Sequence, residues 1–156
     1  MFDSFVGHYV RELVRHVPMT AGRKARFERM RFHNLNVVAA ELKTTFDIDV
    51  LAGLDSDDIE FAARMFHRRH VYEHNGGEAD EKYIRESGDT SVRPKQALRE
   101  TQESAHRVAG LVAKIACNLH RGFHEILEPI AAPIGHHTER LQREQAHAPG
   151  SMKQKR

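Results

Sequence analysis

The stretch that most constrains the fold reads SDDIEFAARMFHRRHVYEHNGG and spans residues 56–77. Its apolar side chains follow one another at spacings of three and four, which predicts an amphipathic helix. They are Ile59, Ala62, Ala63 and Phe66. Asp55 or Ser56 is placed to cap the first turn, and Gly76–Gly77 predicts the end of the helix. We therefore expect one helix with well-defined ends near the middle of the chain.

The rest of the chain carries three long helical patterns, one short helical pattern and no convincing strand. These patterns cover residues 2–17, 21–46, 79–87 and 94–127. After Pro129 the composition changes, because Pro133, Gly135, Pro149 and Gly150 interrupt any helical pattern. We predict an all-α, up-and-down bundle of four long helices plus one short helix over residues 1–129. A flexible C-terminal tail is expected over residues 130–156.

The last long pattern has apolar residues spaced by seven, which is typical of a helix in a bundle. One predicted seam consists of Leu98, Ala105, Val112, Leu119 and Ile126. A second seam consists of Thr101, Val108, Ile115 and Gly122. Both seams are expected to face the other helices.

The composition indicates a soluble globular protein. Apolar residues make up 40% of the 156 residues and charged residues 29%. No apolar run approaches the roughly 18 residues that a membrane span needs, so no membrane partner is expected. Cys117 is the single cysteine, which excludes an internal disulfide and fits a reducing compartment. We predict a cytoplasmic protein with Cys117 as a small core residue.

The formal net charge is only +2, but the positive residues are clustered. Five cations lie within nine residues, namely Arg23, Lys24, Arg26, Arg29 and Arg31. A second group consists of Arg64, Arg68 and Arg69. Such clusters can steer a phosphate chain toward a binding site, although each can also be a solvated helix face.

The inward stripe of the helix over residues 56–77 turns polar at its C-terminal end, where Arg69, His70 and Glu73 follow Phe66. Ideal helical geometry separates His70 from His74 by about 40° around the axis, and Arg69 from His74 by about 140°. His74 lies where the helix frays before two glycines, so we expect an arginine and a histidine to reach one small volume. A helix C-terminus also favours protonated histidine.

These groups suit RNA cleavage by the substrate's own 2′-hydroxyl, a reaction that needs no metal. A histidine can transfer protons near neutral pH, and an arginine can stabilise the extra negative charge on phosphorus. His70 or Asn75 can hold the imidazole or the phosphate in place.

The run Arg69-His70-Val71-Tyr72-Glu73-His74, followed by Asn75-Gly76-Gly77, resembles the RHxxxHNxG branch of the HEPN superfamily of helical RNases and RNA-binding modules. The resemblance implies a helical bundle and a homodimer with a composite, metal-independent endoribonuclease site. It assigns Arg69 to the scissile phosphate, His74 to proton transfer, His70 to the polar position after the arginine and Asn75 to an accessory role.

By the same resemblance we expect RNA as substrate, no cofactor, and an antitoxin or regulatory protein as a further partner. Family members serve in toxin–antitoxin systems and antiviral defence, and some have lost catalysis. One departure concerns the branch that is regulated by nucleotide transfer to a tyrosine two residues after the motif histidine. Gly76 occupies that position here, so this regulation is not indicated.

Two alternatives remain open. His70-Val71-Tyr72-Glu73-His74 also fits the H-x-x-E-H pattern of zinc hydrolases, in which both histidines bind the metal and Glu73 acts as the base. That site needs a further ligand from another element. In the second alternative, Arg69 pairs with Glu73 or across a dimer axis, and the protein is a non-catalytic RNA-binding or dimerisation module.

Overall fold

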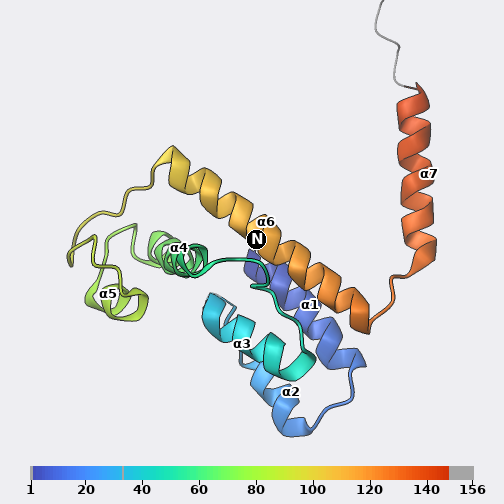
Figure 1. Cartoon of the computed structure of the whole chain (residues 1–156), viewed down its shortest axis with the longest axis horizontal. Coiled ribbons are helices and arrows are strands. Elements are labelled where there is room, and N and C mark those ends of the chain that lie inside the picture. The colour runs from blue at the N-terminus through green and yellow to red at the C-terminus, as the bar shows by residue number, and fades with distance from the viewer. Residues whose placement is uncertain (1, 33, 148–156) are drawn as a thin grey trace, which may run out of the picture. The chain divides into compact units, whose positions relative to one another are not determined.

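The computed structural model describes residues 2–32 and 34–147, and all regular elements in these ranges are helices (Figure 1). The helices are α1 Phe2–His16, α2 Ala21–Glu28, α3 Leu35–Phe46, α4 Ser56–His74, α5 Glu81–Ser87, α6 Gln102–Ile126 and α7 Ala131–His147. The all-α prediction is confirmed for the described ranges. The chain divides into two compact units, one ending at Ile126 and the other beginning at Leu127. None of the described helices combines the length and the hydrophobicity that crossing a bilayer requires.

In the first unit, α6 packs against both α1 and α4, and α4 also contacts α3 and α5. The most deeply buried large apolar side chains come from α1, α3 and α6, and include Leu13, Leu42, Ile115 and Leu119. This arrangement places α4, with its polar C-terminal turn, at the centre of the helix contacts. Burial of each such aliphatic side chain contributes roughly 1.5–3 kcal/mol.

The buried face of α6 differs from the predicted seams. It consists of Leu111, Ile115, Asn118, Leu119 and Gly122. Ala105 is exposed and Ile126 is 37% exposed, so the first seam is wrong at both of these positions. The pattern of this face follows the ordinary helical period, because α6 packs on two different neighbours, α1 and α4, and does not pair with one supercoiled partner.

Two residues of α6 hold the connection between α3 and α4. Asn118 is buried and donates its Nδ2 hydrogens to the carbonyl oxygens of Val50 and Ala52, at 3.1 and 2.9 Å. Gly122 lies directly against Ile48, since a Cβ atom there would come within 2.8 Å of Ile48 Cγ2. A side chain in α6 thus satisfies a loop backbone that has no regular partners of its own.

The single helix predicted over residues 21–46 is divided into α2 and α3. Asn34 ends the intervening turn and accepts the amide of Val37 at 3.2 Å as the N-cap of α3. Asparagine is among the best N-cap residues, because its side chain satisfies an amide that lacks a helical partner. Phe27 of α2 and Phe46 of α3 bring the two helices together, with ring centroids 5.2 Å apart.

The helix predicted over residues 94–127 begins only at Gln102. The backbone before it pairs with the segment that follows α4. The bonds are Lys95 N–H to Ala79 O at 2.6 Å, Ala79 N–H to Gln96 O at 2.9 Å and Leu98 N–H to Gly77 O at 2.8 Å. These long-range bonds replace the helical ones. Thr101 then accepts the Ser104 amide at 3.0 Å, as an N-cap residue does.

A second, smaller core lies behind the end of α4. It consists of Val71, Ala79, Tyr83 and Leu98, with Ile84 and Val92 packed against it. This cluster joins α4, α5 and the chain before α6. The C-terminal turn of α4 is therefore anchored on one side by apolar packing.

Two further expectations differ from the structure. A helix, α7, occupies Ala131–His147, within the range 130–156 where a flexible tail with an interrupted helical pattern was predicted. Pro133 stands in its first turn, where proline breaks no hydrogen bond, so it was wrongly taken as a breaker. Pro149 and Gly150 lie outside the described residues. Cys117 is exposed on α6, so its assignment to the core was also wrong.

Candidate functional site

The helix that carries the candidate residues has the ends that its sequence predicts. Asp55 is the N-cap of α4 and accepts the Asp58 amide at 2.8 Å. At the other end, Gly76 and Gly77 have φ angles of 61° and 82°, and the Gly77 amide bonds back to Val71 O at 3.2 Å. This bond lies beyond the regular helical ladder and closes the glycine-terminated end of α4, so it fixes where the motif residues lie.

Arg69 lies on the α1 side of α4 and is held by carboxylates. Its guanidinium donates to both oxygens of Asp3, at 2.6 and 3.2 Å, and lies 3.4 Å from Glu73. The bonds that Arg69 donates to Asp3 raise the pKa of Arg69, against the opposing effect of burial. Its Nε atom is buried and has no hydrogen-bond partner. Asp3 therefore holds the Nη atoms of Arg69, and an anion that bonds to them in the same way would replace this carboxylate.

His70 and His74 form a pair of rings at the C-terminal end of α4. Their ring centroids are 4.4 Å apart, with 55° between the planes. His74 is exposed and is the last residue of the helix. His67 is one turn earlier, and burial lowers its pKa, with the charge of His70 adding to this effect and Glu86 opposing it.

Asn75 is tied to the helix that follows. Its Nδ2 atom donates to Asp80 Oδ2 at 2.8 Å, and the other Asp80 oxygen accepts the Tyr83 amide at 2.6 Å as the N-cap of α5. The hydrogen bond from the Tyr83 amide has the largest effect on the pKa of Asp80, which it lowers. The bond from Asn75 lowers this pKa further. Asn75 thus couples the end of α4 to α5, which is a positioning role.

Within one chain the structure does not bring Arg69 and His74 together. No hydrogen bond or ion pair joins them among the described residues, and Arg69 is turned toward Asp3 of α1. A single copy therefore shows no direct contact of this kind between the two residues, and Arg69 is bonded to α1 instead. The spacing of about 140° on an ideal helix explains the result, because the glycine stop does not unwind the last turn of α4.

Arg68, which the sequence analysis placed in a cluster of cations and not in the motif, is the more completely bonded arginine. Its guanidinium contacts Asp89 at 2.6 Å, Glu100 at 2.9 Å and the Tyr83 hydroxyl at 3.1 Å. Its side chain is 12% exposed and that of Asp89 only 1%. No local signal marks Asp89 as a partner, because it lies 21 residues further along the chain.

The network shifts the pKa values of its members. Burial and the bond to Asp89 raise the pKa of Tyr83 to about 12, which keeps its hydroxyl a donor. Burial alone would raise the pKa of Asp89, but bonds from Ser91, Tyr83 and Arg68 lower it well below its ordinary value. Asp89 is therefore a fully charged, fully bonded carboxylate that fixes the loop before α6.

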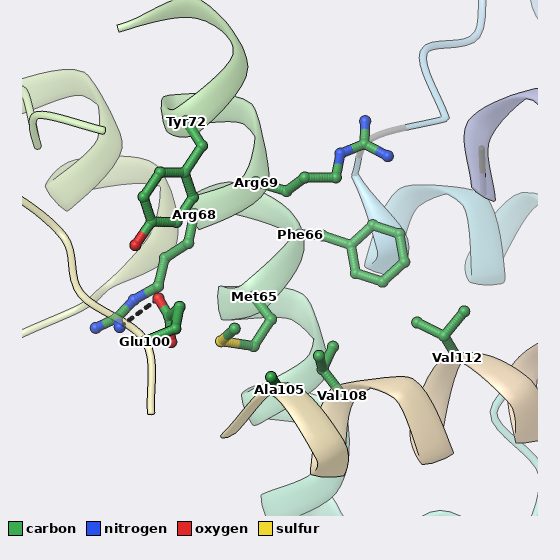
Figure 2. A pocket seen from close by; sticks show the side chains of 9 residues that line it. All are labelled: Met65, Phe66, Arg68, Arg69, Tyr72, Glu100, Ala105, Val108 and Val112. Carbon is green, nitrogen blue, oxygen red and sulfur yellow. Dashed lines mark hydrogen bonds and ion pairs between the residues drawn. The ribbon is translucent and has the colours of Figure 1, made fainter. Parts of the chain in front are cut away.

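A cavity of about 360 Å³ lies between α4 and α6 beside the two arginines (Figure 2). Its walls are mostly apolar, with contributions from Met65, Phe66, Val108 and Val112. Arg68 and Tyr72 extend to one side of α4 in Figure 2, and Arg69 and Phe66 extend to the other. Arg68 and Arg69 both line the cavity, but they extend from opposite sides of α4.

The zinc alternative receives no support from the geometry. Within the described residues, no three or more His, Cys, Asp or Glu side chains are grouped so that they could hold a metal ion. Glu73, the base in that alternative, is within 3.4 Å of Arg69 instead. That Arg69–Glu73 contact is the one expected for the structural alternative.

Comparisons with protein-family models, with curated proteins and with solved structures found no match for this chain. The interpretation of the site therefore rests on the residues at the end of α4 and on their contacts.

Proposed function

We propose that this protein is a HEPN-like, metal-independent endoribonuclease whose site is built from Arg69, His70, His74 and Asn75 of a homodimer. The observation that carries the proposal is the pair of His70 and His74 rings, 4.4 Å apart, at a helix end where His74 is exposed. An accessible imidazole beside a second imidazole provides a proton acceptor and a proton donor near neutral pH.

The reaction follows from these groups. His74 takes the proton of an RNA 2′-hydroxyl, the 2′-oxygen bonds to the adjacent phosphorus, and the bond from phosphorus to the 5′-oxygen breaks. A protonated histidine gives its proton to that leaving oxygen. The products are a 2′,3′-cyclic phosphate and a 5′-hydroxyl. Arg69 stabilises the negative charge on phosphorus once the phosphate has replaced Asp3.

The separation of Arg69 from His74 in one copy is the reason for proposing a dimer. A two-fold axis near the end of α4 would let each site combine residues of both copies. The proposal includes a role in a toxin–antitoxin or antiviral defence system, which follows from the family resemblance and is secondary to the chemistry.

Cleavage of a single-stranded RNA in EDTA tests the proposal. We expect the wild-type chain to produce 2′,3′-cyclic phosphate ends, and His74→Ala to lose about 100-fold or more of the rate, as removal of an acid–base group does. His106→Ala is the matched control, because His106 is an exposed histidine on α6. Equal cleavage by His74→Ala and His106→Ala would end the proposal.

The Arg69–Asp3 pair favours a second candidate, a non-catalytic RNA-binding or dimerisation module. In that case the pair is a permanent ion pair that holds α1 against α4, and Arg69 does not bind a phosphate. The absence of cleavage by the wild-type chain, with dimerisation or RNA binding retained, would favour this second candidate.

A further inference from the structure

A groove between α1 and α2 lies apart from the end of α4 and plays no part in the proposed cleavage. It encloses about 450 Å³. Its apolar lining comes from Val10 and Val14, one turn apart on α1, from Phe27 of α2 and from Phe32 in the turn after α2. Phe32 is only partly buried, so part of its ring is available at the surface.

Three cations line the same groove. Arg11 and Arg15 are one turn apart on α1, next to the valine stripe, and Lys24 projects from α2. All three are exposed, and none has a hydrogen-bond or ion-pair partner among the described residues. Glu28 is the one acidic side chain in the lining. The groove therefore combines an apolar lining with three positively charged side chains that form no ion pair with the described residues.

Gly7 brings an aromatic ring and a guanidinium to the same place. A Cβ atom on Gly7 would lie 3.2 Å from Arg11 Nη1 and 3.3 Å from Phe32 Cε2. Because Gly7 has no side chain, both groups occupy the space beside α1. A ring next to a guanidinium suits a nucleotide, whose base stacks on the ring while its phosphate pairs with the cation.

The positive surface continues beyond the groove. Arg23, Arg29 and Arg31 are exposed on α2 and on the turn that follows it, and they also have no partner among the residues that the structure describes. Arg26, by contrast, is neutralised by Glu41 of α3. A row of free cations suits a polyanionic chain better than a single anionic group.

We infer that the α1–α2 groove binds single-stranded RNA, with a base against Phe32 and phosphates on Arg11, Arg15 and Lys24. The inference rests on the proposed function, since the groove would hold the RNA that the end of α4 cleaves. A single strand is favoured over a duplex because only unpaired bases can enter an apolar, aromatic-lined groove.

Fluorescence anisotropy on the full chain tests the inference, with a labelled RNA of about 12 nucleotides whose 2′-hydroxyls are methylated to prevent cleavage. We expect Arg11→Glu/Arg15→Glu to weaken binding about tenfold or more. The slope of log K against log salt should fall by about 1.4, because each lost phosphate contact to a single strand removes about 0.7. Arg85→Glu/Arg93→Glu, an equal charge change at exposed positions elsewhere, should change binding less than threefold.

Phe32 provides a second, independent measurement. Phe32→Leu should weaken binding of the single strand about fivefold or more, whereas Phe32→Tyr retains a stacking ring and should stay within about twofold. Binding of duplex RNA should not distinguish Phe32→Leu from the wild type. Circular dichroism and thermal unfolding of each variant separate lost binding from lost folding.

Three outcomes would overturn the inference. In the first, the two double variants weaken RNA binding equally. In the second, Phe32→Leu binds single strands as tightly as the wild type does. In the third, the wild type fails to bind RNA but sediments with phosphatidylserine-containing vesicles. The last result would assign the groove to an anionic lipid surface. Because the methylated RNA is not cleaved, His74→Ala should bind it with the affinity of the wild type. Loss of cleavage and loss of RNA binding in the groove are therefore measured separately.

Discussion

Arg68 and Arg69 are neighbours in the chain, yet α4 directs them into different environments. Arg68 is 12% exposed and contacts two carboxylates and a tyrosine in a network around the buried Asp89. Arg69 is 33% exposed and is held by Asp3, which is equally exposed, and by Glu73. One arginine of the pair is therefore fixed in a buried network, whereas the other forms a partly solvent-accessible ion pair.

Removal of each arginine in turn is the strongest test of this comparison. Arg68→Ala leaves Asp89 charged and buried without its main partner, so we expect the free energy of unfolding to fall by about 3 kcal/mol or more. Arg69→Ala leaves Asp3 able to reach water, and the expected loss is about 1 kcal/mol or less. Urea denaturation of the two variants measures both values.

The unfolding midpoint of Arg68→Ala should therefore lie well below that of Arg69→Ala. Equal losses in the two variants would contradict the separation of a structural arginine from an exchangeable one. A loss for Arg68→Ala that Asp89→Ala largely restores in the double variant would locate the effect in the uncompensated carboxylate.

The pH dependence of stability sharpens the same contrast. The folded-state pKa of Asp89 is depressed below its ordinary value of 3.8, so its contribution is fully present above that value. The contribution is lost as the pH falls from about 4 through the folded pKa, because the unfolded chain takes up the proton first. We expect the stability gap between the wild type and Asp89→Asn to be larger at pH 6 than at pH 3.

Asp3→Asn is the control for that measurement. Asp3 is one-third exposed, so solvent screens its interaction with Arg69 and the corresponding gap should be small at both pH values. A gap for Asp89→Asn that does not narrow at low pH would show that the carboxylate is held by packing and not by its charge.

The sequence alone predicted the parts of α4 that depend on near neighbours. The cap at Asp55, the stop at Gly76–Gly77 and the shared face of His70 and His74 are set by residues within about one helical turn of each other. For this reason the ends of α4 and the ring pair could be derived from spacing.

The remaining features depend on contacts between distant segments. Asp3 reaches Arg69 from 66 residues away, and Asp89 reaches Arg68 from 21 residues away. Likewise, residues 95–98 leave the predicted helix because they pair with residues 77–79. A helical pattern shows which faces are apolar, but it contains no information on which of two adjacent arginines meets a carboxylate from another element.

The Asp3–Arg69 pair gives the prediction with the smallest effect. If Asp3 competes with a phosphate for Arg69, Asp3→Asn should tighten RNA binding by about fivefold, the factor that corresponds to the roughly 1 kcal/mol of a partly exposed ion pair. Anisotropy with the non-cleavable RNA measures the change. Glu125→Gln removes the same charge from an exposed position on α6 and should change the affinity much less.

A double-mutant cycle separates competition at Arg69 from a general change in charge. When Arg69 is already alanine, Asp3→Asn has no guanidinium to release, so its gain in affinity should disappear. A gain that persists in the Arg69→Ala background would come from the lower overall negative charge. In that case the Asp3–Arg69 ion pair is a fixed contact between α1 and α4. The non-catalytic candidate function then explains the C-terminal end of α4 better than the ribonuclease does.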